Sequence, residues 1–269
     1  MSLSIAGKTA IVTGAASGLG LAVARHFVDK GANVMFVDID EARLEDQVGA
    51  EARAEGPVRL FVGDLCQKLT LTNLLAATVD AFDRIDILVN ASRQISRSDP
   101  LCPEGDAVEH LLQQNLLTAL RLSQLTAKRM IARSEKSDER PLQTGSIINL
   151  SSIAAIRTQP ELLAYSISCA AVEQMTRSMA VALAPQGIRV NAVSFGSVMS
   201  GSLQLALKDT PALRASITER TPMKRIAPAS EIVETVQFLA SDAAAFMTGQ
   251  VITIDGGRSL IDPATAPIH

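Results

Sequence analysis

Three glycines, Gly14, Gly18 and Gly20, separate an apolar strand-like run from a run with helical spacing. Glycines in such a turn let backbone N–H groups and the amino end of a helix come close to a pyrophosphate. Their spacing is GxxxGxG rather than the commoner GxGxxG, so the glycines alone are weak evidence. Their place at the first strand-to-helix junction predicts a dinucleotide site. The turn residues expected to contact it are Gly14, Ser17, Gly18, Leu19 and Gly20.

Asp38 ends the second strand-like run, 24 residues after Gly14. A carboxylate there can accept hydrogen bonds from both ribose hydroxyls of the adenosine, and it would repel a 2′-phosphate. We therefore expect NAD rather than NADP as the cofactor. The alternative stays open because Arg43 could swing toward a phosphate. Asp38 could also be an ordinary turn acid, since Asp40 lies beside it.

The elements that would position these residues alternate along the chain. Nearly uninterrupted apolar runs are typical of parallel strands buried on both faces. The expected strands span 9–13, 33–38, 58–64, 86–91, 146–151, 188–194 and 250–255. The expected helices span 18–30, 41–55, 67–83, 104–133, 161–184 and 229–241. This order predicts one Rossmann-like α/β domain over residues 1–269, with a doubly wound parallel sheet of seven strands.

Two irregular segments interrupt this alternation. Residues 133–145 are polar and charged, which is typical of a solvated surface loop. Residues 196–226 follow the sixth strand and are too long for an ordinary turn. Long insertions at the carboxyl end of a strand often cover a binding site, so we expect a substrate-binding lid. The alternative is a pair of short helices that only pack against the domain.

Composition limits the partners and the compartment. The formal net charge is −3 and no Lys/Arg-rich tract occurs, so neither a nucleic acid nor an anionic membrane is an expected partner. The chain has no apolar run long enough to span a membrane and begins with a strand-like pattern, so we expect no export signal. Three widely spaced cysteines and three scattered histidines favour a reduced, cytoplasmic protein without a metal site.

The order of motifs over residues 5–258 resembles that of the short-chain dehydrogenase/reductase family. TGAASGLG is similar to the family's TGxxxGxG turn, and DILVNAS is similar to its DILVNNAG segment. The other matching stretches are VGDL (62–65), LLQQNLLTAL (111–120), NLSS (149–152) with a tyrosine thirteen residues later, IRVNAVSFGSV (188–198) and MTGQVITIDGG (247–257). This resemblance implies hydride transfer between a nicotinamide and an alcohol or carbonyl substrate.

The resemblance also implies roles for single residues. Tyr165, the chain's only tyrosine, would exchange a proton with the substrate oxygen. Ser152 would hydrogen-bond the same oxygen, and Asn115 would hold a water in a proton relay. A hydroxyl group suits the first two tasks because it both donates and accepts. Further cofactor contacts are expected from Asp64, Leu65, Asn90, Ala91, Val198 and Ser200.

Cys169 departs from the family's YxxxK motif. Positions i and i+4 share a helix face, so a lysine there would sit near the phenol and lower its pKa of about 10. Cys169 supplies no charge, and Arg177 on the same run lies twelve residues after Tyr165, about 18 Å along the helix axis from it. The simpler interpretation of Cys169 is a small buried filler. The alternative is a reactive thiol, although no neighbour in sequence would activate it.

Two other departures lie near the same site. Arg93 stands where the family has the last glycine of NNAG, and Phe195 replaces the proline of its PG pair. One hypothesis is that Arg93 brings a cation toward the ribose or the substrate and partly replaces the missing lysine. The simpler expectation, which the sequence favours, is that Arg93 points into solvent. Phe195 is expected to narrow the nicotinamide pocket.

Two main functions remain open. The first is an NAD(H)-dependent oxidoreductase that interconverts a secondary alcohol and a ketone, with catalysis impaired or modified by Cys169. The alternative is a weakly active or inactive dinucleotide-binding member that serves as a partner subunit or ligand-binding module. A dehydratase or isomerase on the same fold is a third. The family resemblance also implies a homodimer or homotetramer built through the helices near 104–133 and 161–184.

Overall fold

The computed structural model describes residues 2–136 and 143–262. Its main sheet has seven parallel strands in the order β3-β2-β1-β4-β5-β6-β9, which confirms the expected doubly wound fold. The strands are β1 (Thr9–Thr13), β2 (Asn33–Asp38), β3 (Val58–Val62), β4 (Ile87–Asn90), β5 (Gly145–Ser152), β6 (Ile188–Phe195) and β9 (Val251–Ile254). The strand order reverses between β1 and β4, and ligands bind at such a point in open parallel sheets.

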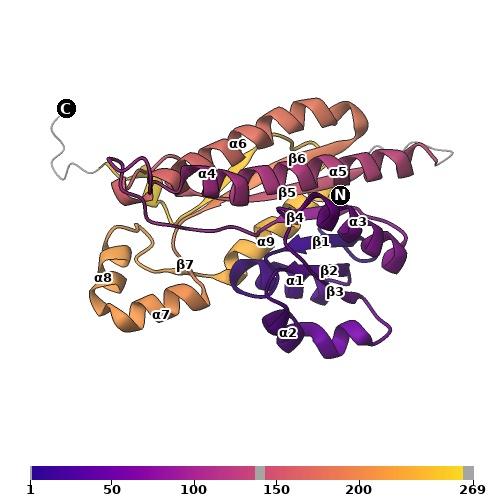
Figure 1. Ribbon diagram of the computed structural model, residues 1–269, viewed down its shortest axis with the longest axis horizontal. Helices are drawn as coiled ribbons and strands as arrows, with labels where there is room; N and C mark the ends of the chain where they lie inside the picture. Colours follow the sequence, from indigo (N-terminus) through magenta and orange to yellow (C-terminus); the bar gives the residue numbers. More distant parts are fainter. Residues whose placement is uncertain (1, 137–142, 263–269) are drawn as a thin grey trace.

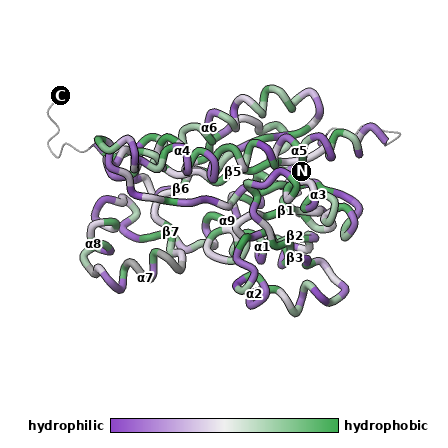
Figure 2. The backbone as a smooth tube through the Cα atoms, viewed as in Figure 1, coloured by the Kyte–Doolittle hydropathy of each residue, from purple (hydrophilic) through white to green (hydrophobic). Residues whose placement is uncertain are grey.

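Helices cover both faces of this sheet (Figure 1). One layer is α1 (Gly18–Asp29), α2 (Glu41–Arg53) and α9 (Ala229–Ala240), and the other is α3 (Lys68–Phe82), α5 (Thr118–Ser134) and α6 (Leu163–Leu183). Each layer forms its own apolar core with the strands, and Figure 2 shows hydrophobic residues concentrated along the sheet. Burial on both faces explains the uninterrupted apolar strands. Short 3-10 turns span Ile153–Ala155, Pro160–Leu162, Ala184–Gln186, Asp242–Ala244 and Arg258–Leu260.

The helix expected over 104–133 spans 108–134 in the structure and includes a π-helical turn. It begins as α4 (Val108–Leu111), continues as a π-helix (Leu112–Leu117) and then becomes α5. The chain before α4 is not helical because the Asp106 carboxylate accepts a hydrogen bond from the Val108 amide at 2.9 Å, a local turn that competes with the helix. π-helical segments often occur at functional sites, and this one contains Asn115.

The segment after β6 forms a small unit away from the main layers (Figure 1). It contains β7 (Val198–Met199), α7 (Gly201–Asp209), α8 (Pro211–Glu219) and β8 (Ala227–Pro228). β7 and β8 pair in parallel, which closes the segment on itself before α9 begins. In the other irregular segment, the predicted surface loop at 133–145, residues 137–142 lie outside the described residues.

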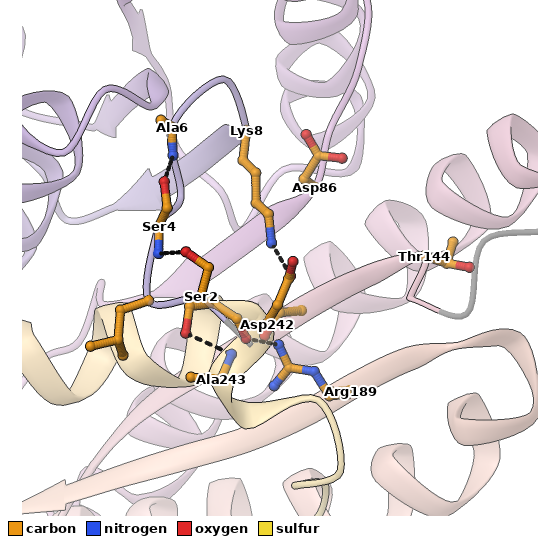
Figure 3. A network of polar contacts seen from close by, with 12 residues as sticks. Ser2, Ser4, Ala6, Lys8, Asp86, Thr144, Arg189, Asp242 and Ala243 are labelled. Atoms are coloured by element: carbon orange, nitrogen blue, oxygen red, sulfur yellow. Dashed lines mark hydrogen bonds and ion pairs between the residues drawn. The ribbon is translucent and has the colours of Figure 1, made fainter.

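A polar network joins the amino-terminal segment to the turn after α9 (Figure 3). It lies at the amino ends of the parallel strands, whereas the glycine turn follows the carboxyl end of β1. Lys8 donates to Asp242 at 2.6 Å, and the Ala243 amide donates to the Ser2 carbonyl at 3.1 Å. Arg189 is 6% exposed and donates to the backbone carbonyls of residues 239 and 241 at 2.7 and 3.1 Å. These contacts close the bottom of the sheet with charged and polar groups that are hydrogen-bonded.

Asp86, labelled in the same view, is buried just before β4 (Figure 3). Its carboxylate accepts hydrogen bonds from Arg84 at 2.7 and 2.8 Å, from Arg133 at 2.8 Å and from the Thr9 amide at 2.9 Å. Burial on its own would raise the pKa of this carboxyl. The hydrogen bonds outweigh burial and hold the pKa below its ordinary value.

Replacing Asp86 with asparagine should therefore destabilise the fold by about 2–4 kcal/mol at pH 7, because two arginines lose their anionic partner. A depressed folded-state pKa contributes stability above the unfolded pKa of about 3.9, and that contribution is lost as pH falls through the folded value. The gap between parent and variant should thus shrink in acid. Denaturant unfolding at pH 7 and in acid measures it. Asp80→Asn, an exposed change on α3, is the matched control and should shift stability by less than about 0.5 kcal/mol.

Candidate active site and cofactor cleft

A cleft of about 850 Å³ lies at the carboxyl ends of the central strands. It runs from the glycine turn, past the end of β2, to the start of the segment that follows β6. Of the residues expected to contact a cofactor, those that line it are Gly14, Ser17, Gly18, Leu19, Gly20, Asp38, Ala91, Val198 and Ser200. Its walls also include Arg93 and Phe195. The structure thus brings most of the predicted cofactor set to one cavity.

The glycine turn fits a dinucleotide phosphate. Gly14 has φ of +68°, and a Cβ there would press on the Ser92 backbone. A Cβ on Gly20 would collide with the Gly14 carbonyl oxygen, so the turn can be this tight only without side chains. Helix α1 begins at Gly18, and Ser17 makes no side-chain capping bond. The first N–H groups of α1 are therefore available to an anion in the cleft.

Asp38 is held with its carboxylate beside the turn. One oxygen accepts from the Ala16 amide at 3.0 Å, and the other accepts from the amides of Ile39 and Asp40 at 2.8 and 3.1 Å. Arg43, which could have favoured a phosphate, lies 3.3 Å from the Asp40 carboxylate instead. The carboxylate of Asp38 is thus fixed in the wall of the cleft, beside the glycine turn.

Three predicted cofactor residues lie outside this cleft. Asp64 accepts from the Cys66 amide at 2.9 Å, and this bond holds its pKa below the ordinary value. Leu65 is buried in the core beneath α3. Asn90 donates inward, to the Ser123 hydroxyl at 2.9 Å and to the side chain of residue 149 at 2.8 Å. Asn90 lines the small cavity beside Tyr165 instead of the cleft.

Tyr165 lies in the first turn of α6, and its side chain is 3% exposed. Burial raises the pKa of the phenol to about 12, and the positive charge of Arg93 opposes this shift. A hydrogen bond with the hydroxyl of Ser152, at the end of β5, also lowers the pKa, whereas Cys169 raises it. The phenol therefore keeps its proton at neutral pH. Ser152 itself accepts from the Ala154 amide at 3.2 Å.

Arg93 does not point into solvent, so the favoured expectation for this residue was wrong. Its guanidinium donates to the Tyr165 hydroxyl at 2.7 Å. Its central carbon also lies 4.3 Å from the ring centroid of Phe195, in cation–π distance. A buried phenol that accepts from a cation, and an aromatic face beside it, offset the loss of hydration of the guanidinium.

Asn115 anchors the loop that carries Arg93. Its side-chain NH2 donates to the Gln94 carbonyl at 2.9 Å and to the Ser168 hydroxyl at 3.0 Å, and its oxygen accepts from the Gln94 amide at 2.7 Å. Both protons of the amide are used in these bonds. The sequence did not indicate Gln94, because its bonds to Asn115 are made by its backbone and leave no signal in the residue type.

Cys169 fills the slot that a lysine side chain would occupy. It is 5% exposed and packs with Tyr165 in a small apolar cluster. Burial raises the pKa of the thiol, so the thiolate that reactive cysteines need is disfavoured. A cavity of about 20 Å³, bounded by Cys169, Asn115, Tyr165 and Arg93, remains beside it. The filler interpretation fits these surroundings.

The described residues contain neither a cluster of metal-binding side chains nor a membrane-spanning helix. Within residues 2–136 and 143–262, no group of three or more His, Cys, Asp or Glu side chains is arranged to hold a metal ion. None of the helices in those ranges combines the length and the apolar composition needed to cross a membrane.

Residues 14–259 match a family profile described as Enoyl-(Acyl carrier protein) reductase. An uncharacterized oxidoreductase of Thermotoga maritima is 32% identical over 262 residues, which covers 96% of this chain and 100% of the relative. The similarity therefore extends through the glycine turn, the loop with Arg93 and the helix with Tyr165.

Two solved dehydrogenases have the same fold at close to full length. A 7α-hydroxysteroid dehydrogenase, solved with NADH and 7-oxo glycochenodeoxycholic acid, has a TM-score of 0.85 and 28% identity and covers 95% of both chains. A gluconate 5-dehydrogenase from Burkholderia cenocepacia, solved with NADP and tartrate, has a TM-score of 0.86 and 27% identity and covers 97% of this chain and 98% of that one. These relatives include one solved with each nicotinamide cofactor.

Proposed function

Because the chain belongs to the short-chain dehydrogenase/reductase family and is an oxidoreductase, we propose that it interconverts a secondary alcohol and a ketone with NAD(H) as the cofactor. The observation that carries this proposal is the Tyr165 phenol. It lies beside a serine hydroxyl and a cation, next to a cleft that begins at a glycine turn suited to a dinucleotide.

The residues divide the proton chemistry between them. When bound, the nicotinamide accepts hydride from the alcohol carbon or returns it to the carbonyl carbon. In the oxidative direction the O–H bond of the alcohol breaks and its proton passes to Tyr165 in its phenolate form, which becomes the phenol. In reduction the phenol O–H bond breaks and the proton passes to the carbonyl oxygen. The Ser152 hydroxyl donates a hydrogen bond to the same substrate oxygen. Asn115 positions the loop on which Arg93 lies rather than holding a water with its amide protons.

Two features support NAD over NADP. The Asp38 carboxylate faces the cleft, where it would repel a 2′-phosphate. Arg43 is paired with Asp40, and its side chain is largely exposed. Within the described residues that line the cleft, Arg93 is the only arginine or lysine, and it lies at the end with Phe195 rather than beside Asp38.

Replacing Asp38 with asparagine should weaken NAD binding about tenfold to a hundredfold, because hydrogen bonds to a charged acceptor become neutral ones. The same change should strengthen NADP binding relative to NAD, since the repulsion of the phosphate is removed. Calorimetric titration with both cofactors measures both effects. Asp46→Asn changes an exposed carboxylate on α2 that does not line the cleft and is the matched control. An unchanged NAD:NADP ratio in Asp38→Asn would reject this assignment.

Other parts of the proposal concern the substrate and the assembly. We infer that residues 196–226 form a lid, since Met199 and Leu203 of this segment line the cleft. A homodimer or homotetramer through the helices near 104–133 and 161–184 is also part of the proposal, and its support is the family to which the chain belongs. A cytoplasmic site of action remains part of the proposal.

The second candidate, a dinucleotide-binding member with little catalysis, is favoured by one observation. The lysine slot holds Cys169, and the phenol has a pKa of about 12. NADH formation over a panel of secondary alcohols, with NAD binding measured by calorimetry, separates the two. Oxidation of at least one alcohol supports the enzyme. Tight NAD binding without NADH formation supports the binding module.

A further inference from the structure

Arg93 reaches the phenol from a different element than the one that carries the lysine slot. It follows β4 in the loop that begins at Ala91, whereas Cys169 lies one turn after Tyr165 on α6. The 2.7 Å bond is donated by the guanidinium to the phenol oxygen, which is the atom that exchanges the proton. Arg93 lines both the large cleft and the small cavity beside Cys169, so the guanidinium lies in the wall between them.

The guanidinium is held in place rather than free to swing. Phe195 is 3% exposed at the end of β6 and presents its ring 4.3 Å from the guanidinium carbon. On the two sides of Arg93, the Ser92 amide donates to the Thr13 hydroxyl at 3.0 Å and the Gln94 backbone is bonded twice to Asn115. A side chain on such a supported loop loses less freedom on forming its hydrogen bond.

The groups that act on the phenol come from three elements. Ser152 lies at the end of β5, Cys169 on α6, and Arg93 after β4. The next charged group on α6 is Glu173, whose carboxylate accepts from the Ser151 hydroxyl at 3.0 Å and acts on Cys169. Among the described residues that shift the phenol's pKa, Arg93 alone carries positive charge. A phenolate at this buried position would have its charge balanced by Arg93.

We propose that Arg93, supported by the ring of Phe195, is a catalytic residue that provides the cation for Tyr165 in place of a helix lysine. The three departures from the family pattern, at residues 93, 169 and 195, are then parts of one rearrangement. The inference rests on the proposed function. As the alcohol proton moves to the Tyr165 oxygen, or returns from it, the guanidinium N–H stabilises the charge that the phenol oxygen carries. No other bond is made or broken by Arg93.

The test is chemical rescue of Arg93→Ala. We expect this variant to lose about a hundredfold in kcat/KM for an alcohol that the parent oxidises, which is typical of removing one donor to a developing oxyanion. Guanidinium, added well below the concentrations that unfold proteins, should raise the kcat/KM of the variant to at least a tenth of the parent's value. It can do so because it fits the vacated space beside Phe195. Urea has the same shape without the charge and should not. Arg97→Ala, on the same loop with an 86% exposed side chain, should behave as the parent.

A second readout does not require activity. Since Tyr165 is the only tyrosine, protein labelled with 13C at the tyrosine ζ carbon gives one phenol resonance. Arg93→Ala should shift that resonance, and guanidinium but not urea should return it. The inference is overturned if Arg93→Ala leaves both kcat/KM and the resonance unchanged, or raises activity because Arg93 obstructs the cleft. Absence of activity in the parent would reject the proposed function and, with it, the catalytic role of Arg93. A rescued resonance would then still show that Arg93 is the cation that acts on Tyr165.

Discussion

Tyr165→Phe should lower kcat for alcohol oxidation by about a thousandfold, the largest loss of any single change at this site. Phenylalanine preserves the ring that packs in the cluster with Cys169 but removes the atom that exchanges the proton. NAD affinity should stay within about twofold, since the phenol is not part of the glycine turn that binds the phosphates. Single-turnover formation of NADH measures the loss, and calorimetric NAD titration is its control. A variant with the parent's rate would remove Tyr165 from the mechanism.

The same residue predicts the pH dependence. Burial raises the phenol pKa to about 12, so the phenolate that accepts the alcohol proton is scarce at neutral pH. The kcat/KM for oxidation should therefore keep rising with pH through the neutral and mildly alkaline range. A plateau already reached near neutrality would show that the base is another group.

Cys169→Lys should have different effects on kcat/KM in the parent and in Arg93→Ala. Comparing the two backgrounds tests the role of Arg93 better than either variant alone. From the sequence alone, a lysine here should raise activity, since it restores the missing cation. In the structure Arg93 already donates to the phenol at 2.7 Å, so a second cation would be repelled by the first. We expect less than a threefold gain in the parent. In Arg93→Ala the same lysine should recover at least tenfold in kcat/KM, because it becomes the only cation beside the phenol.

Cys169→Met controls for filling the slot without charge. It should give no recovery in Arg93→Ala, because methionine adds volume to the small cavity but no cation. Equal recovery with methionine and lysine would mean that packing, not charge, limits the reaction. A large gain from lysine in the parent would mean that Arg93 does not act on the phenol.

The fold was predictable because its signals are local. Each parallel strand is buried on both faces, so β1 and β2 appear in the sequence as the apolar runs 9–13 and 33–38 with the bounds that the structure gives. The π-helical turn within 104–133 was not predictable from periodicity, because no residue type marks it. Asn115 lies in this turn, and its side chain bonds the Gln94 backbone and the Ser168 hydroxyl.

The parts of the site that depend on backbone conformation were predictable from the sequence. The orientation of a long side chain was not. Gly14 and Gly20 are required by the close approach of the chain to itself, and that requirement is visible in the residue type. Arg93 has the same residue type whether it points to solvent or to Tyr165. Its direction is decided by the ring of Phe195 and by the buried phenol oxygen, which come from β6 and α6 and are brought together only by folding.

Isotope transfer follows hydride movement and proton exchange at Tyr165 together, with a secondary alcohol that carries deuterium on the hydroxyl-bearing carbon. Over a panel of such alcohols with NAD, we expect deuterium in the NADH formed by the parent and about a thousandfold less in Tyr165→Phe. If NAD binds but no alcohol transfers deuterium to it, the protein is not this oxidoreductase. If parent and variant transfer deuterium equally, Tyr165 does not exchange the proton.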